Sequence, residues 1–392
     1  MKILVVCQYY YPEPVRISDI CEELVRQGHQ VDVLTGVPNY PMGQIYDGYR
    51  KGKKRHEIIN GVRVFRTFTV GRRQGILFRF LNYFSYAFSS AHYVSKLDRD
   101  YDVVFVNQLS PVLMANAGVK YKKKHGTKLV LYCLDLWPES LVVGGIKRNG
   151  LIYKCFDAIS KKLYSYVDAF LVSSKEFATY FKKHFGIEER IIGYLPQYAE
   201  ELFLPHCSED KETIDLTFAG NIGVAQSVET IIKAAAELKN IENLRFHVVG
   251  DGSSLENCKR LAGDLKADNV VFYGRKPLEA MPEFYNMSDA MLVTLSDDPV
   301  IAMTLPGKVQ SYMASGKPII GAINGEAANV ILESKCGLCG PAMDHLELAN
   351  NIRRFLDSDK NVFGENSRKY YLEHFEKGVF IDTLVKELND AK

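Results

Sequence analysis

The sequence predicts an α/β protein with two doubly wound domains that face a cleft. Short apolar segments with the length of strands alternate with helical stretches in both halves of the chain, which is typical of parallel sheets covered by helices. The 392 residues suffice for two domains with full cores, and 47% hydrophobic and 24% charged residues are ordinary for a globular protein. An irregular stretch with two prolines and a charge run, residues 195–212, separates the halves.

The N-terminal half contains seven apolar segments that we expect to be strands. Asn60-Gly61, which separates two of them, is a strong hairpin signal. A first helix is expected over residues 17–27, where Gly28 ends it. The predicted strands are residues 3–7, 31–35, 56–59, 62–68, 103–106, 129–133 and 170–172.

The C-terminal half repeats the alternation of strands and helices. The predicted strands are residues 216–220, 246–249, 270–273, 290–295 and 319–321, and everything after residue 342 has helical spacing. The predicted parts of the chain are an N-terminal domain (1–198), a linker (199–212), a C-terminal domain (213–372) and a final helical segment (373–392).

Charge is distributed unevenly along the chain. The net charge is only +2, yet residues 1–195 hold 29 Lys+Arg against 17 Asp+Glu, and the remainder holds 20 against 30. This asymmetry indicates either an anionic partner of the first half or attraction between the halves. No apolar run approaches the roughly 20 residues of a spanning helix, and the apolar start lacks a cleavage site, so we expect a cytoplasmic protein. Cys336 and Cys339 form a lone CxxC, for which two buried thiols are the simplest interpretation.

Residues 296–326, SDDPVIAMTLPGKVQSYMASGKPIIGAINGE, carry the most specific signal. A loop with Pro306 and Gly307 leads into a helix over 308–314, which Gly316 stops before the next strand. The run MASGKPII behind this loop and helix resembles the C-terminal domain of family 4 glycosyltransferases, in particular the branch of bacterial O-antigen and capsule enzymes that includes N-acetylfucosamine-type transferases. The resemblance implies the GT-B fold with two Rossmann-like domains, retention of anomeric configuration, and a final helix that returns to the N-terminal domain.

The turn Gly220-Asn-Ile-Gly223 follows a predicted strand and precedes a helix over 228–238. Glycines there allow backbone N–H groups to approach a phosphate, although a tight turn without ligand explains them equally well. The resembling family usually places an Arg and a Lys here to hold the donor diphosphate. This chain has Asn221 and Gln226 at those positions, so diphosphate binding is expected to use backbone donors and cations from elsewhere.

The family's two donor-site glutamates, which have seven residues between them, are also absent. Aligning on residues 314–316 places Met303 and Ser311 at those positions. Met303 offers a soft apolar surface, which suits a deoxy or N-acetylated sugar better than a fully hydroxylated one. Glu326 is a candidate replacement carboxylate, or simply an acid favoured by a helix N-terminus.

Lys308 and Arg16 are the cations we expect near the donor phosphates, and solvated surface cations are the alternative for each. A lysine at a helix start opposes the helix dipole, so a nearby anion would explain Lys308. Arg275, at a strand end, resembles a base-contacting position of the family, whereas Asp251 fits a plain turn as well as a ligand contact.

Asp135 is the leading candidate for the acceptor side, because it closes a strand beside Trp137, the only tryptophan. In the resembling family a His or Asp lies there near the acceptor hydroxyl, and a carboxylate can act as general base or orient the acceptor. Helix capping is the alternative role. Glu139 is the reserve candidate, and Asn39 and Asn107 are further positions at the cleft edge.

Residues 71–88 combine cations with apolar side chains at helical spacing. Basic residues at the start and apolar mass afterwards suit a helix at a membrane surface, while part of the apolar stripe must belong to the core. The predicted membrane-facing residues are Arg72, Arg73, Phe78, Arg79 and Phe80. A polyprenyl-diphosphate-linked glycan acceptor would bring an anionic headgroup and the inner leaflet of a bilayer together, and no nucleic-acid-binding motif accompanies the charge.

The sequence therefore predicts a retaining glycosyltransferase that uses a nucleoside diphosphate sugar, with UDP expected as the nucleotide and no metal or other cofactor. The turn after the first strand has no GxGxxG, which excludes a typical dinucleotide dehydrogenase. A GT-B sugar-nucleotide epimerase and a non-catalytic partner subunit remain as alternatives, the latter because the family's Glu, Arg and Lys contacts are missing.

Overall fold

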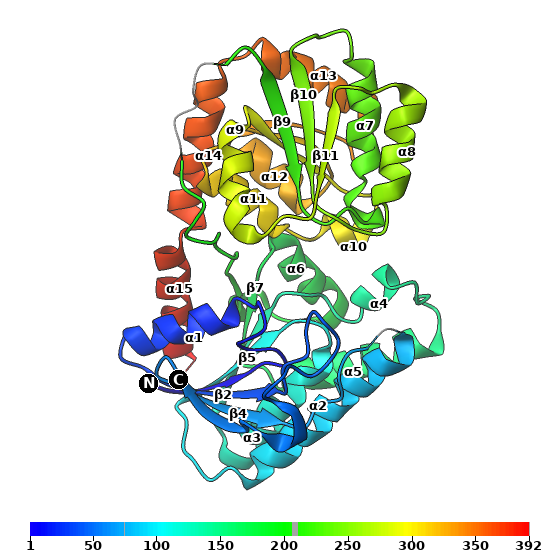
Figure 1. Cartoon of the computed structure of the whole chain (residues 1–392). Helices are drawn as coiled ribbons and strands as arrows, with labels where there is room; N and C mark the ends of the chain where they lie inside the picture. The colour runs from blue at the N-terminus through cyan, green and yellow to red at the C-terminus, as the bar shows by residue number, and fades with distance from the viewer. Residues whose placement is uncertain (74, 206–210, 392) are drawn as a thin grey trace. The chain divides into compact units, whose positions relative to one another are not determined.

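The structure, a computed structural model, describes residues 1–73, 75–205 and 211–391. The chain forms two compact units (Figure 1). The first comprises Met1–Ser173, Phe177–Leu195 and Ile381–Lys392, and the second comprises Ser174–Glu176 and Pro196–Phe380. The last turns of the C-terminal helix are therefore grouped with the N-terminal unit. Of the predicted linker, residues 206–210 lie outside the described part of the chain.

The first unit is built on an eight-stranded sheet in the order β3-β4-β2-β1-β5-β6-β7-β8. All neighbours are parallel except β3 and β4, which form the hairpin predicted at Asn60-Gly61. The strands are β1 (Lys2–Val6), β2 (Gln30–Gly36), β3 (His56–Ile59), β4 (Val62–Thr67), β5 (Val103–Gln108), β6 (Lys128–Cys133), β7 (Ala169–Val172) and β8 (Ile192–Tyr194).

Burial on both faces explains why the central strands are continuous apolar runs. Ile3, Leu4, Val5 and Val6 of β1 have no exposed surface, since helices cover the two faces of a parallel sheet. Parallel strands end at the same edge, so the residues that follow β1, β2, β5 and β6 meet there.

Helices and short helical turns connect these strands. They are α1 (Ile17–Arg26), η1 (Arg50–Gly52), α2 (Ile76–Lys96), η2 (Val112–Ala115), α3 (Asn116–His125), α4 (Ser140–Val143), α5 (Leu151–Tyr164), α6 (Lys175–Tyr180), η3 (Phe181–Phe185) and η4 (Glu189–Ile191). No helix in the described residues is both long enough and apolar enough to cross a membrane.

The second unit contains a six-stranded sheet in the order β11-β10-β9-β12-β13-β14, with every recorded pairing parallel. Order reverses at β9, where strands are added first on one side and then on the other, which is where ligands bind in doubly wound sheets. The strands are β9 (Ile214–Ala219), β10 (Leu244–Val249), β11 (Val270–Gly274), β12 (Ala290–Thr294), β13 (Ile319–Ala322) and β14 (Gly337–Gly340).

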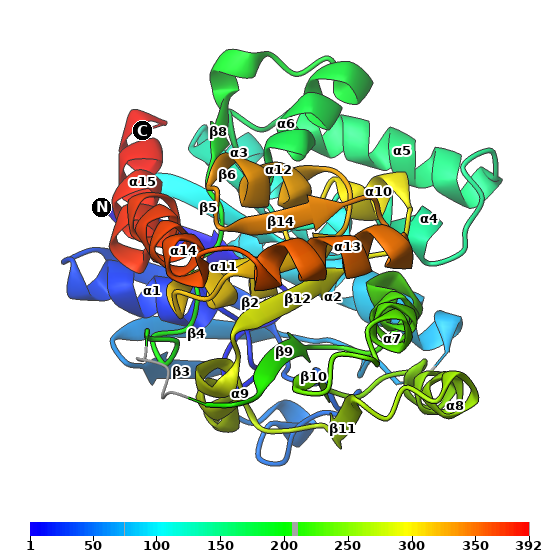
Figure 2. The ribbon, with the colours of Figure 1, turned by 90° about the horizontal axis from the view of Figure 1, so that it is seen from above.

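Two buried apolar clusters hold the helices of this unit against its sheet. On one face α7 packs beside α13, and α13 also contacts β13 and β14 (Figure 2). On the other face α11 packs beside α14. The helices and turns are η5 (Val224–Gln226), α7 (Val228–Glu237), α8 (Leu255–Leu265), η6 (Leu278–Ala280), α9 (Met281–Met287), α10 (Pro299–Ala302), α11 (Gly307–Ala314), α12 (Glu326–Glu333), α13 (His345–Leu356), α14 (Lys360–His374) and α15 (Lys377–Asp390).

The two strands that the sequence did not predict are short edge strands. The three residues of β8 are all partly exposed, and β14 has the sequence GLCG, which lacks a strand-like apolar pattern. Cys336 and Cys339 flank and occupy β14 as free thiols. Burial raises their pKa values to about 12 and about 11, so both thiols stay protonated at neutral pH.

The loops after β9 and β10 touch each other closely. A Cβ atom on Gly250, whose φ is +146°, would lie 1.8 Å from the carbonyl oxygen of Gly220. The backbone N–H of Ile222 donates to the carbonyl of Asp251 at 2.9 Å, and that of Gly220 donates to the carbonyl of Val249 at 2.9 Å. Close packing of the two backbones thus fixes the turn Gly220–Gly223.

Gly250→Ala is expected to destabilise the protein by on the order of 3 kcal/mol, since it adds a clash with backbone to a strained φ. Gly263→Ala is the matched control, because no atom lies within 4 Å of its added Cβ in the last turn of α8. It should stabilise by about 0.5–1 kcal/mol. Denaturant unfolding measures the free energy of unfolding of both variants and of the wild type. Equal stabilities of the two variants would contradict the packing described for the two loops.

Candidate functional site

Lys308 lies in the first turn of α11 and reaches the turn after β9. Its Nζ donates to Oε1 of Gln226 at 2.6 Å and lies 4.0 Å from the centroid of the Phe218 ring. The same Nζ would be 3.0 Å from a Cβ on Gly220, so the ammonium group is held directly beside the glycine turn. The structure brings together Gly220, Gln226 and Lys308, which the sequence predicted as donor-binding residues.

The Lys308 ammonium group has no acidic partner in the described residues. Its residue is only partly exposed, and burial lowers the pKa of the ammonium group from 10.5 to about 7. A buried cation without a counter-charge is costly, and a bound anion would restore its charged state. The arrangement is therefore suited to binding a phosphate group beside the glycine turn.

Gln226 is positioned by the end of the neighbouring strand. Its carbonyl accepts a hydrogen bond from Oγ1 of Thr294 at 2.6 Å, and the Ser296 N–H bonds to the carbonyl of Ala225 at 2.9 Å. Asn221 is exposed, and its side-chain amide lies over the buried Gly223. Lys308 thus supplies, from α11, a cation at the position of Gln226.

The remaining residues around α11 make local contacts. Pro306 is the N-cap residue and Gly307 the exposed first residue of α11. Ser311 is buried, and its hydroxyl donates to the carbonyl of Gly307 at 3.2 Å, within its own helix. Met303 is partly exposed at the end of α10, and its carbonyl accepts from Oγ of Ser174 at 2.5 Å.

Glu326 is the buried first residue of α12. One carboxylate oxygen accepts the backbone N–H of Lys175 at 3.2 Å, a residue grouped with the same unit, and burial raises the pKa of the carboxyl. Its place in the first turn of α12 is the helix N-terminal position that the sequence offered as one of the two roles, and its carboxylate also holds a backbone donor outside that helix. Glu326 is therefore not among the proposed sugar contacts.

Two further predicted donor residues make no recorded contact with Lys308: Asp251 bonds within its own loop, and Arg275 follows a strand that is not adjacent to β9. Asp251 is exposed and accepts the N–H of Gly252 at 2.7 Å, which is the turn role considered from sequence. Arg275 is exposed and follows β11, which is separated from β9 by β10.

In the first unit, Asp135 follows β6 and is held by two serines. Its carboxylate oxygens accept hydrogen bonds from the hydroxyls of Ser110 and Ser140, and Nε1 of Trp137 donates to the Ser110 hydroxyl at 2.9 Å. Burial raises the pKa of Asp135, and the two hydroxyl donors and the charge of Arg72 partly offset this rise. The N-cap residue of α4 is Glu139, so Asp135 is not its N-cap.

The charge of Arg72 counteracts the rise that burial causes in the pKa values of Tyr9, Tyr83 and Asp135, so its guanidinium lies among these three side chains. It is partly buried, its guanidinium lies 5.7 Å from the Tyr83 ring centroid, and Tyr83 in turn packs edge-on to Trp137. The membrane-facing prediction for Arg72 is therefore corrected. Phe80 is corrected as well, because its ring stacks on the rings of Phe84 and Phe156.

The other predicted residues on α2 and before it lie at the surface. Arg73 and Arg79 are exposed, and the guanidinium of Arg73 lies 5.7 Å from the ring of the partly exposed Phe78. Gln74, between them, lies outside the described residues.

Asn39 and Glu13 hold the loop that follows β2. Glu13 is buried and accepts the backbone N–H groups of Tyr10, Asn39 and Tyr40 at 3.0, 2.7 and 2.7 Å. Burial raises its pKa to about 7. The side-chain oxygen of Asn39 accepts the N–H of Arg72 at 3.0 Å, so Asn39 positions Arg72.

Glu139 is occupied by three donors, which argues against a role as base. Arg148 Nη2 donates to its carboxylate at 2.7 Å, the Tyr153 hydroxyl at 2.7 Å and the Tyr180 hydroxyl at 3.0 Å. Asn107 is buried within β5, and Arg16 immediately precedes α1.

Sequence reasoning missed Tyr9, Glu13, Tyr83, Ser110 and Ser140. Tyr9 and Glu13 lie in the turn after β1, at the edge where the parallel strands end, so their position was an available signal. The serines and Tyr83 carry no local pattern, since only the folded chain brings them to Asp135.

Comparison with known proteins agrees with this geometry. Residues 14–194 match the glycosyl transferase 4-like domain, and residues 205–370 match glycosyl transferases group 1. WbjE of Pseudomonas aeruginosa, named as a probable glycosyltransferase, is 25% identical over 292 residues, covering 71% of this chain and 72% of WbjE. WcaI of Escherichia coli (strain K12), whose name assigns it to colanic acid biosynthesis, is 27% identical over 342 residues, covering 81% and 82%.

Solved structures share the fold. Sucrose-phosphate synthase from Thermosynechococcus elongatus superposes with a TM-score of 0.76 at 16% identity, and Anabaena HepE in complex with UDP with 0.72 at 14%, each covering 100% of both chains. The architecture is thus the GT-B fold. The chain is a glycosyltransferase that joins a 4-like domain to a group 1 domain.

Lys308→Met is expected to raise the stability of the ligand-free protein, because it removes a buried cation that lacks an acid. The folded pKa is about 7 and the unfolded value 10.5, so the unfolded state binds the proton more tightly. Lys308 therefore destabilises the wild-type protein fully at pH values below its folded-state pKa. This destabilisation decreases as the pH rises toward its unfolded-state pKa. Thermal unfolding should show a larger gain at about pH 6.5 than at about pH 9.5.

Lys317→Met is the control for that experiment. Lys317 Nζ is also enclosed, but it donates to the carbonyls of Asn286 and Ser288 at 3.2 and 2.9 Å, so its loss leaves buried acceptors unpaired and should destabilise. A Lys308→Met gain that is equal at both pH values would contradict the assignment of the titrating group.

Proposed function

We propose that the chain is a retaining glycosyltransferase that moves a sugar from a UDP-sugar to a polyprenyl-diphosphate-linked glycan. The observation that carries the donor side is the uncompensated Lys308 ammonium group beside the Gly220 turn. In this proposal the donor diphosphate lies against the turn, where backbone N–H groups and Lys308 meet its charge without a metal ion.

The proposed reaction forms a bond between an acceptor oxygen and the anomeric carbon while the bond from that carbon to the UDP phosphate breaks. The acceptor proton passes to the leaving phosphate, and Asp135 accepts a hydrogen bond from the acceptor hydroxyl and orients it. Lys308 stabilises the charge that develops on the leaving group, which is the largest contribution we assign to one side chain. The three donors on Glu139 leave Asp135 as the sole carboxylate we propose here.

The class of product follows by analogy with the relatives. WcaI is named for colanic acid biosynthesis, which supports a role in making O-antigen, capsule or exopolysaccharide. Anabaena HepE was solved with UDP, which supports UDP as the nucleotide. Met303 at the position of a family glutamate supports a deoxy, N-acetylamino sugar, and the structure leaves it partly exposed.

A peripheral position at the inner leaflet is the proposed location. Leu77, Leu81 and Phe88 are 68%, 44% and 69% exposed, and their spacing places them on one side of α2, whose N-terminal end also carries the exposed Arg73 and Arg79. An exposed apolar face with cations at one end suits an interface with anionic lipid. Flotation with vesicles that contain anionic lipid should recover the wild type, and Leu77→Glu/Leu81→Glu should reduce recovery; unchanged recovery would contradict this location.

Incubation with a panel of UDP-sugars, with and without a polyprenyl-diphosphate glycan, tests the reaction. We expect acceptor-dependent release of UDP, with 6-deoxy-amino sugars preferred over UDP-glucose, and a product whose anomeric configuration matches the donor. If the UDP-sugar is epimerised and no sugar is transferred, the chain is an epimerase and the proposal is wrong. If the donor binds but is not turned over, the chain is a non-catalytic subunit.

Asp135→Asn separates acceptor chemistry from donor binding in the same assay. We expect kcat/KM for the acceptor to fall by about 10²-fold, because the acceptor hydroxyl loses its orienting hydrogen bond, while UDP binding is unchanged. Ser110→Ala is the matched variant: it removes a hydrogen bond that lowers the Asp135 pKa, so the acidic limb of the pH–rate profile should move to higher pH. An Asp135→Asn enzyme with wild-type kcat/KM for the acceptor would remove Asp135 from the proposed site.

A further inference from the structure

Two adjoining pockets open in the first unit between the loop after β2 and the start of α2. The arginine pocket, of about 440 Å³, is lined by Arg72, Arg73, Arg79, Tyr40 and the backbone around Gly43 and Gly75. The apolar pocket, of about 600 Å³, is lined mainly by Ile45, Phe68, Val70 and Phe78. Gly43 and Arg73 line both, so the two pockets share a wall.

The arginine pocket is built to receive negative charge. Among the described residues, no carboxylate lies within ion-pairing distance of Arg72, Arg73 or Arg79. The pocket also adjoins the N-terminus of α2, a 21-residue helix whose first turn contains no acid. One guanidinium group can donate two parallel hydrogen bonds to the oxygens of a phosphate. Three guanidinium groups around one pocket therefore match a diphosphate better than a single phosphate.

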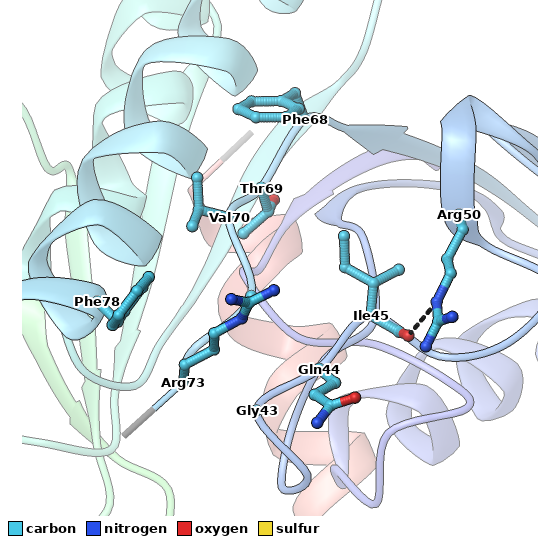
Figure 3. A pocket seen from close by; sticks show the side chains of 10 residues that line it. Gly43, Gln44, Ile45, Arg50, Phe68, Thr69, Val70, Arg73 and Phe78 are labelled. Atoms are coloured by element: carbon cyan, nitrogen blue, oxygen red, sulfur yellow. Dashed lines mark hydrogen bonds between the residues drawn. The ribbon is translucent and has the colours of Figure 1, made fainter. Parts of the chain in front are cut away.

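The apolar pocket has a different character. Figure 3 shows Ile45, Phe68, Val70 and Phe78 around it, with Arg73 among them. Arg50, also in its lining, is already engaged: its Nε donates to the carbonyl of Ile45 at 3.4 Å, and Nη2 pairs with Asp47 at 3.4 Å. Phe68 is 56% exposed, so a large apolar side chain is presented to a ligand rather than to the core.

Arg72 joins these pockets to the acceptor side of the proposed reaction. It lines the arginine pocket and its charge also acts on Asp135. Asn39 fixes the Arg72 backbone, and Tyr83 lies under its guanidinium. A ligand with its diphosphate at Arg72 would therefore place its first sugar toward Asp135.

We propose that the arginine pocket binds the diphosphate of a prenyl-diphosphate-linked acceptor and that the apolar pocket binds the first isoprene units of its chain. This inference rests on the proposed function for the identity of the acceptor. Binding of a prenyl diphosphate in the two pockets, however, does not require catalysis. It assigns Arg73 and Arg79 to the acceptor diphosphate, separate from Lys308, which serves the donor.

Direct binding tests the proposal on the full chain without any reaction. The probes are farnesyl diphosphate, inorganic diphosphate and UDP, titrated by calorimetry into the wild type, Arg73→Gln/Arg79→Gln, Phe68→Ser and Arg55→Gln. Arg55 is an exposed cation of the same unit that does not line either pocket, which makes its variant the control for general electrostatics.

We expect Arg73→Gln/Arg79→Gln to weaken farnesyl diphosphate binding by at least about tenfold while UDP binding is unchanged. Phe68→Ser should weaken farnesyl diphosphate but not inorganic diphosphate, so that the preference for the prenyl compound shrinks. Arg55→Gln should behave as the wild type. Unfolding midpoints of the variants should match the wild type, since the replaced side chains are exposed.

In the binding assay, three outcomes would overturn the inference: equal loss of UDP and farnesyl diphosphate binding in the double arginine variant, equal loss of farnesyl diphosphate binding in Arg55→Gln, or no loss of binding in any variant. Failure of the proposed function looks different. In that case the pockets bind farnesyl diphosphate with the expected dependence on the arginines, yet no UDP-sugar is transferred to any acceptor. If the arginine variants transfer sugar to a diphosphate-linked acceptor at the wild-type rate, the proposed function stands but the two pockets are not the acceptor site.

Discussion

The ammonium group of Lys308 must be charged to hold a phosphate, yet the fold encloses it between an amide oxygen and an aromatic ring. Gln226 gives it one acceptor and Phe218 the face of its ring, but neither carries a full negative charge. Desolvation therefore lowers its pKa to about 7, so the charged form of the Lys308 amine is disfavoured in the ligand-free site. Under the proposed donor role, an anion at the glycine turn would relieve this cost, and the ligand-free protein would give up stability for binding.

The same constraint explains much of the surrounding architecture. Lys308 reaches the turn only because α11 begins beside the end of β9, and Tyr312, one turn later, donates its hydroxyl to the carbonyl of Ala219 at 3.1 Å. Thr294 at the end of β12 fixes Gln226 from the other side. The contact between the backbones of Gly220 and Gly250 leaves the turn one conformation. The cation, its acceptor and the turn are thus fixed by three neighbouring strands at the topological switch of the sheet.

Much of this was predictable from sequence, and the limits have physical causes. Apolar runs such as residues 3–6 predict buried parallel strands, and the residues after them predict the site edge. GLCG lacks that pattern, so β14 was missed. Lys308 was predicted from its awkward place in a helix, but its contact with Gln226 spans 82 positions of the chain and has no local signature.

Orientation was harder to predict than position. Arg72 and Arg73 are adjacent in the sequence and chemically identical, yet one lies against Tyr83 and the other is exposed beside Phe78. The difference depends on Asn39, whose amide oxygen holds the Arg72 backbone from a loop 33 residues earlier. Helical spacing likewise predicted the apolar stripe of α2 without distinguishing Phe80, which meets Phe156, from the exposed Leu77 and Leu81.

The basic excess of the first half now has a more specific interpretation. Several of its cations lie in ion pairs: Arg63 and Arg99 share Asp32, Arg66 pairs with Glu57, and Arg148 pairs with Glu139. A carboxylate beside a cation weakens the field of that cation outside the protein. Arg72, Arg73 and Arg79 have no such carboxylate among the described residues, and they meet at one pocket beside a helix N-terminus. Unpaired charge concentrated in this way favours an anionic ligand of this unit as the reason for the excess, because attraction between the halves would not require the cations to converge.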